Sequence, residues 1–235
     1  PIQPTAHYSM GGIPVDKGCH VVIDSEGTKM NGFFAAGECA CVSVHGGNRL
    51  GTNSLLDAVV FGERAGKSAL EYAKSKDFAN VNEGQEKAKV LKKFEDIFQR
   101  DGSESYNEIR NEMKEVMMTK CGVFRDEEKL KACIETLKGL QARFKKGKVT
   151  DKGKLFNTEI YEIIELGNML GMARLIATAA LRRQESRGGH FRTDFPKRDD
   201  EKFLHHSMVY DSPDGLVIKT KPVVITKYQP EERKY

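Results

Sequence analysis

The chain has 235 residues, of which 39% are hydrophobic, and this is enough for one large or two small domains with a buried core. Disorder is therefore not expected. The formal net charge of +4 is spread over 38 basic and 34 acidic side chains, so no single-sign field points to a nucleic-acid partner. No segment approaches the roughly 20 uninterrupted apolar residues of a membrane span. We expect any membrane association to come through a partner.

The five cysteines include no Cys-x-x-Cys pair, and Cys39 and Cys41 are spaced for one face of a strand. Reduced, buried thiols are the expected state, and an iron–sulfur cluster held by this chain alone is not expected. His205 and His206 have no third ligand at a suitable spacing. No metal site is therefore predicted.

The first residues carry neither an initiator methionine nor a basic-then-apolar signal pattern, and we expect a fragment of a longer polypeptide. Two short β-type runs at 20–23 and 33–36 are joined by a segment rich in turn residues, which predicts a hairpin or an adjacent pair of strands. Apolar residues at helical spacing over 54–76 predict a buried helix, in which Gly62 and Gly66 would let another backbone approach closely.

After residue 76 the composition becomes charged and helical, with a polar connector at 80–85. Amphipathic spacing predicts helices at 109–120 and 130–144 as antiparallel neighbours. A third helix over 158–185 is apolar on more of its circumference and should be the centre of a small bundle that stops at the glycines 188–189.

The last part of the chain is predicted to be irregular from residue 190, with short strands at 216–218 and 223–225. Arg187, His190 and Arg192 follow the end of the third helix. Cations at a helix carboxyl end interact favourably with its dipole, so we expect them to serve packing or an interface rather than catalysis.

One histidine, His7, lies beside the paired glycines 11–12, where a backbone can approach a ligand with no Cβ in the way. A lone histidine near a turn is most often a solvated or hydrogen-bonded loop residue. This segment alone is weak evidence for a site.

The segment 37–56 is more specific, because it combines a strand end, a glycine-lined loop and the amino end of a helix. Free N–H groups near Ser54 and Leu55 would stabilise a negative charge. Arg49 in the same loop offers a planar fork that matches a carboxylate in two-point contact. A surface loop rich in Asn and Gly, with Arg49 in a salt bridge, is the alternative that these residues leave open.

Taken together, these segments resemble the flavoprotein family of succinate dehydrogenase and fumarate reductase, with L-aspartate oxidase as its nearest relative. The resemblance covers nearly the whole chain. The stretches that carry it are His7–Gly12, Ala36–Glu38, His45–Leu56, Glu185–His190, Asp194–Pro196 and Gln229–Tyr235.

The resemblance implies that His7 and Arg49 bind the substrate carboxylates. It makes Glu38 a hydrogen-bond partner of the FAD ribityl or ribose hydroxyls and places Ser54 and Leu55 against the isoalloxazine. In the family a hydride passes between a substrate carbon and flavin N5, while an arginine handles the proton. That arginine and the histidine that commonly links FAD covalently are expected upstream, so no catalytic residue is assigned in this chain.

No G-x-G-x-x-G follows a strand here, so the pyrophosphate cradle of the family is missing. FAD is therefore expected in the complete subunit but not on this fragment, which should be inactive alone. The predicted fold is α+β. Residues 1–76 would form a small β-containing piece, the carboxy-terminal part of an FAD- and substrate-binding domain, 77–190 a three-helix bundle and 191–235 an irregular tail with short strands.

The resemblance also implies an oxidoreductase of electron transport and the tricarboxylic acid cycle that exchanges electrons between succinate or fumarate and quinone. Its expected partners are an iron–sulfur protein subunit and, through it, membrane-anchor subunits at the cytoplasmic face of the inner membrane. A soluble L-aspartate oxidase, which reoxidises its flavin without such a partner, is the alternative. A docking module without enzymatic activity is a third.

Overall fold

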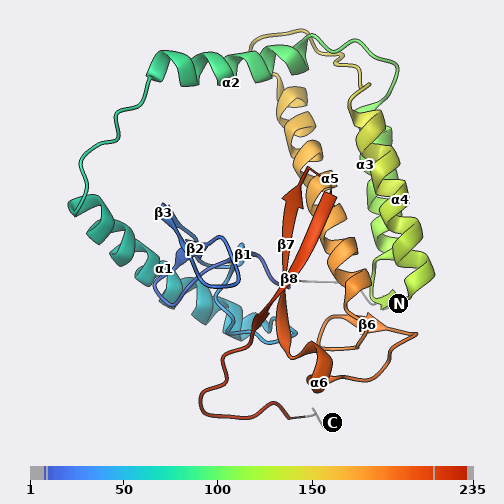
Figure 1. Ribbon diagram of the computed structural model, residues 1–235. Helices are drawn as coiled ribbons and strands as arrows, with labels where there is room; N and C mark the ends of the chain where they lie inside the picture. Colours follow the sequence, from blue (N-terminus) through green and yellow to red (C-terminus); the bar gives the residue numbers. More distant parts are fainter. Residues whose placement is uncertain (1–7, 9, 214, 232–235) are drawn as a thin grey trace. The chain divides into compact units, whose positions relative to one another are not determined.

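The computed structural model describes residues 8, 10–213 and 215–231 (Figure 1). The chain forms two compact units. The helical unit contains Ala73–Gln184 and His190–Pro196, and the β-containing unit contains Tyr8–Tyr72, Glu185–Gly189 and the segment 197–231. The mixture of helices and small two-stranded sheets confirms the predicted α+β class. The boundaries expected at 76 and 190 stay a prediction.

Two small sheets begin the β-containing unit. Their strands are β1 Ile13–Pro14, β2 His20–Val22, β3 Lys29–Phe34 and β4 Ala40–Cys41. β1 and β4 are parallel, whereas β2 and β3 are antiparallel, which is the hairpin alternative of the prediction. Strand β3 begins earlier than expected because the Asp24 carboxylate accepts the N–H of Thr28 at 2.8 Å and closes the turn directly before it. The small core of this region centres on Val15, Val21 and Ala40.

Helix α1, Gly51–Lys74, follows the loop after β4, and the prediction that it is buried is wrong. Asp57 is its only buried residue among those described, and Leu55 and Val59 expose 72% and 71% of their surface. A Cβ at Gly62 or Gly66 would meet no described atom within 4 Å, so the close backbone approach is not found either. Apolar periodicity indicates that a helix has an apolar face but not what covers that face.

The carboxy-terminal strands form an antiparallel hairpin of β7, His205–Ser212, and β8, Gly215–Pro222, after the short helix α6, Asp200–Phe203. The predicted pair at 216–218 and 223–225 is therefore wrong. The first of these runs lies inside β8, whereas the second is not a strand. The partner strand β7 contains only Met208 and Val209 as aliphatic residues, so a search for apolar runs misses it.

Four longer helices build the helical unit, and Figure 1 shows the last three packed side by side. They are α2 Glu83–Phe98, α3 Tyr106–Lys120, α4 Glu127–Phe144 and α5 Thr158–Arg182. The side chains of Asn82, Ser105, Asp126 and Asn157 cap their amino ends by accepting a backbone N–H. The predicted three helices are confirmed. Helix α2 replaces the polar connector expected at 80–85, because Asn82 is its cap.

The core of this unit lies between α3, α4 and α5, and α5 contributes most to it, as predicted. Its buried members on these helices are Tyr106, Ile109, Met113, Val116, Leu130, Cys133, Leu137, Leu140, Ile160, Ile163, Leu166, Leu170, Ala173, Ala177 and Ala180. Among the described residues, α5 is the one helix long and apolar enough to cross a membrane. The packing of α5 in the core of the helical unit explains why this helix is so apolar. Strands β5, Phe124–Arg125, and β6, Phe191–Arg192, form a short parallel pair beside it.

Candidate functional site

The loop between β4 and α1 carries a buried arginine. It turns at Ser43 and Gly46, whose φ angles of 72° and 59° are left-handed. Glycine adopts this conformation without strain, and serine rarely does. The turns bring the loop back onto the first part of α1, and Arg49 is only 5% exposed there.

The guanidinium of Arg49 is held from two sides within the β-containing unit. Its Nη1 donates to Asp57 Oδ2 at 3.0 Å, and both side chains are 3% exposed. Its Nη2 donates to the backbone carbonyls of Glu38 and Ala40, each at 3.3 Å. Its Nε is buried and has no hydrogen-bond partner in the described structure. A buried donor without an acceptor is costly, and a carboxylate admitted to this enclosed position would supply the missing acceptor.

The same aspartate also holds His45, whose Nε2 lies 2.9 Å from Asp57 Oδ2. Asn53 Nδ2 lies 3.0 Å from His45 Nδ1 and 3.2 Å from the Val44 carbonyl. The sequence interpretation missed this set of residues. Asp57 could have been noticed as the only charged residue in the otherwise apolar run 55–61, since a buried carboxylate needs a partner.

The structure places the other predicted residues around this loop, except that His7 lies outside the described residues. Glu38 reaches Arg49 through its backbone carbonyl, whereas its side chain is exposed. Ser54 and Leu55 lie in the first turns of α1. The Ser54 hydroxyl is buried without a partner in the described structure, and Leu55 is exposed.

The amino end of α1 differs from those of the other long helices. Helices α2, α3, α4 and α5 each carry an acidic residue in the first turn, whereas α1 carries none. An acidic side chain there would offset the positive end of the helix dipole. The end of α1, the unpartnered Ser54 hydroxyl and the cationic Arg49 together form a setting that favours an anionic ligand.

A second glycine-rich segment, 185–189, packs on this loop. The N–H of Gly189 donates to the Gly47 carbonyl at 2.9 Å. Arg187 beside it donates to the fully buried Glu185 at 2.7 and 2.9 Å and to Asp200 at 2.6 Å. These ion pairs order the segment that supports the loop, so the partners of Arg187 lie within the fold.

In the helical unit, the fully buried Arg192 caps the carboxyl end of α5. Its Nη1 donates to the carbonyls of Ala180 and Leu181 at 3.2 and 3.1 Å, while its Nε and Nη2 bind the Asp194 carboxylate at 2.7 and 2.6 Å. This contact explains why α5 stops at Arg182 rather than at the predicted glycines, since carbonyls of its last turn already have a donor.

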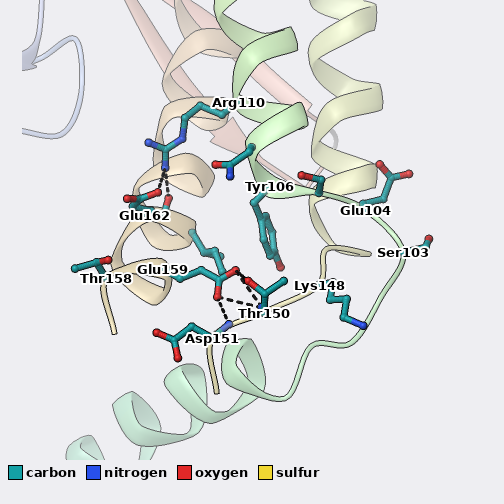
Figure 2. Close-up of a pocket in the computed structure, with 13 residues that line it drawn as sticks. Ser103, Glu104, Tyr106, Arg110, Lys148, Thr150, Asp151, Thr158, Glu159 and Glu162 are labelled. Carbon is teal, nitrogen blue, oxygen red and sulfur yellow. Dashed lines mark hydrogen bonds and ion pairs between the residues drawn. The ribbon is translucent and has the colours of Figure 1, made fainter. Parts of the chain in front are cut away.

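A cavity of about 510 Å³ also lies in the helical unit, at the amino ends of α3 and α5 (Figure 2). Its charged side chains each have a partner within the fold, although the buried Nε of Arg110 has none in the described structure. Glu159 accepts from the N–H and hydroxyl of Thr150 and the N–H of Asp151, and Arg110 Nη2 donates to the Glu162 carbonyl at 2.9 Å. This pairing stabilises the helix ends, and we assign no function to the cavity.

Comparison with known proteins gives the family. Residues 110–235 match the family model of the fumarate reductase flavoprotein C-terminus, and residues 1–55 match that of an FAD binding domain. The fumarate reductase flavoprotein subunit of Haemophilus influenzae is 40% identical over 237 residues, and the 8-methylmenaquinol:fumarate reductase flavoprotein subunit of Wolinella succinogenes is 44% identical over 239 residues. Each alignment covers 100% of this chain and 38% of the relative.

A solved structure of the E. coli quinol fumarate reductase chain FrdA matches with a TM-score of 0.89 at 38% identity, over 99% of this chain and 39% of that one. The chain thus spans about two fifths of the length of these relatives. The first family model alone matches more than half of the residues. The chain therefore belongs to the flavoprotein family of fumarate reductase and succinate dehydrogenase, which confirms the resemblance seen in its sequence.

Proposed function

We propose that this chain is the carboxy-terminal part of the flavoprotein subunit of a quinol:fumarate reductase or succinate dehydrogenase, which transfers a hydride between a C4 dicarboxylate and FAD. The observation that carries the proposal is the buried Arg49, whose Nε has no partner in the described structure and which lies beside the amino end of α1. The relatives named above are fumarate reductase subunits, which favours this reading over an L-aspartate oxidase.

In this proposal Arg49 binds one substrate carboxylate. It is charged, buried and held in place before the ligand arrives, so little reorganisation accompanies binding. A carboxylate would satisfy the unpartnered Nε. His7 is the second proposed carboxylate ligand, on the basis of the family resemblance.

The residues at the amino end of α1 suit one edge of a flavin. When bound, FAD accepts or supplies the hydride. The unpartnered Ser54 hydroxyl and the helix end, which has no acidic residue in its first turn, would stabilise negative charge on the ring. The exposed Leu55 offers an apolar contact beside them, and the exposed Glu38 carboxylate could accept hydrogen bonds from the ribityl or ribose hydroxyls.

The proposed partners are an iron–sulfur protein subunit and, through it, membrane-anchor subunits. FAD at this site would exchange electrons in pairs with the dicarboxylate, and the centres of an iron–sulfur subunit would carry them singly between the flavin and a membrane quinone. The FrdA chain in the matched structure belongs to a quinol fumarate reductase, which supports this arrangement. The complete subunit would then lie at the cytoplasmic face of the inner membrane as a peripheral protein.

The test is Arg49→Lys in the complete subunit, co-expressed with its genomic neighbours. Lysine keeps the charge but loses the planar fork, so we expect kcat/KM for fumarate to fall on the order of 100-fold while FAD content stays normal. Arg64→Lys is the matched control, because Arg64 is exposed on α1, the helix that follows the Arg49 loop. Unchanged fumarate kinetics in Arg49→Lys would refute the proposed substrate role. Oxidation of L-aspartate by a subunit without an iron–sulfur partner would refute the proposed enzyme class.

A further inference from the structure

The carboxylate of Asp57 is the shared anchor of two side chains of the loop. Its Oδ2 accepts from Arg49 Nη1 at 3.0 Å and lies 2.9 Å from His45 Nε2. Asp57 itself is only 4% exposed. A carboxylate buried to this degree is stable only with partners of this kind, so the three residues act as one group.

The hydrogen bonds of Asn53 indicate which ring nitrogen of His45 donates to Asp57. The Asn53 amide nitrogen lies 3.2 Å from the Val44 carbonyl, and a flipped amide would place two oxygens against each other. The same nitrogen donates to His45 Nδ1 at 3.0 Å, so Nδ1 is an acceptor and Nε2 carries the proton that is donated to Asp57. His45 and Arg49 are thus both donors to the carboxylate of Asp57.

The contact with Asp57 also decides which edge of Arg49 is available. Nη1 is occupied by the carboxylate at 3.0 Å. The opposite edge consists of Nε, which has no partner in the described structure, and Nη2, whose two bonds to backbone carbonyls are long at 3.3 Å. This edge is enclosed, because the Arg49 side chain is only 3% exposed. A carboxylate that takes both donors at once therefore displaces the atoms that cover the edge as well as the two long bonds.

We propose that Asp57 is a positioning residue, which holds Arg49 by Nη1 so that the Nε–Nη2 edge faces a substrate carboxylate, with His45 fixing the carboxylate of Asp57 in turn. This inference rests on the proposed function. It adds which edge of the Arg49 guanidinium binds the substrate carboxylate. Without Asp57 the guanidinium loses its counter-charge and its orientation, although the arginine itself is still present.

The test uses the complete subunit with its partners and the variants Asp57→Asn and Asp57→Glu. Glu63→Gln is the control, because Glu63 is an exposed acid on the same helix that pairs with Lys67. Three quantities are measured: FAD content, the Kd of malonate by calorimetry, and KM and kcat for fumarate. Malonate is a dicarboxylate that cannot react, so its binding reports the site apart from turnover.

We expect Asp57→Asn to raise the malonate Kd and the fumarate KM by about 10- to 100-fold with FAD content unchanged and kcat within about threefold, since uniform binding is lost. The control should match the wild type. In an Arg49→Lys background, Asp57→Asn should add less than about threefold, because the aspartate acts through the arginine.

An unchanged malonate Kd in Asp57→Asn, while Arg49→Lys weakens it, would overturn the positioning role and leave the proposed function intact. A malonate Kd that neither variant changes would refute the proposed function as well. If Asp57→Asn does not retain FAD, Asp57→Glu decides, because it keeps the buried charge and displaces only the carboxylate. In Asp57→Glu, a malonate Kd raised at least about fivefold supports the positioning role of Asp57, and a smaller change overturns that role.

Discussion

Gly188 lies so close to Gly47 that a Cβ at position 188 would overlap the carbonyl group of Gly47. The φ angle of Gly188 is 59°, in the left-handed region. The neighbouring Gly189 N–H donates to the same carbonyl at 2.9 Å. Two segments far apart in the sequence thus meet backbone to backbone, and one of them is the loop that carries Arg49.

We therefore expect Gly188→Ala to loosen the Arg49 loop. The left-handed conformation alone costs alanine about 1–2 kcal/mol, and the overlap with Gly47 adds to this cost. Amide hydrogen exchange, followed by mass spectrometry, should become faster in residues 42–50.

The control is Gly139→Ala, in the exposed middle of α4, where a Cβ meets no described atom within 4 Å. It should raise the free energy of unfolding by about 0.5–1 kcal/mol, as expected for alanine in a helix interior. Exchange in 42–50 that is equally slow in both variants would contradict the close approach of Gly188 and Gly47.

Arg192→Ala should destabilise the helical unit strongly. It leaves the carbonyls of Ala180 and Leu181 without their donor, whereas the Asp194 carboxylate is 29% exposed and keeps the N–H of Glu127. Because the lost hydrogen bonds come from a fully buried charged group, we expect a loss of about 2–3 kcal/mol. Urea unfolding followed by helical circular dichroism measures the loss. The control Lys131→Ala removes an exposed pair with Glu127 and should change stability by less than about 1 kcal/mol. Equal midpoints for the two variants would contradict the capping role.

The purified chain should carry no FAD. Glu38, Ser54 and Leu55 supply only one edge of a flavin site, and the sequence contains no G-x-G-x-x-G to cradle the pyrophosphate. The measurement is the visible absorption spectrum after gel filtration in the presence of added FAD. A stoichiometric flavin band would show that one edge is sufficient for binding.

The sequence predicted the elements in which apolar spacing and capping residues agree. Helices α3, α4 and α5 have both, and their faces are buried against one another. Helix α2 escaped prediction because none of its residues is buried, and its apolar residues Val90, Leu91 and Phe94 are exposed. Strand β7 escaped because it has few aliphatic residues.

For the candidate site, too, the sequence indicated the features that depend on local pattern and not those that depend on how the chain folds. Arg49 could be selected by its side-chain chemistry and its neighbouring glycines. Its pairing with Asp57 could not, because it depends on the path of the loop through the left-handed Ser43 and Gly46. Sequence patterns report local conformation well, but which side chains a loop brings together is decided by its dihedral angles and by the surface on which it packs.

His190 should make the helical unit less stable at mildly acidic pH. Its Nδ1 accepts from Arg125 Nη1 at 3.0 Å, and its Nε2 donates to the Arg183 carbonyl at 3.0 Å, so the ring is neutral. Burial, and then the nearby charges of Arg125, Arg183 and Arg192, lower the pKa of His190 from 6.5 to about 4. Between these two values the unfolded chain binds a proton that the folded chain excludes.

Stability should therefore be complete above about pH 6.5 and fall as the pH decreases towards 4, by about 2 kcal/mol between pH 7 and pH 5. Asp194, whose pKa Arg192 lowers to about 2, stays ionised throughout this window and does not contribute to the change. Urea unfolding at both pH values measures the difference. In His190→Gln, which cannot gain a proton but can keep both hydrogen bonds, the loss between pH 7 and pH 5 should shrink by about 2 kcal/mol. A loss as large as that of the wild type would show that His190 is not the group that titrates.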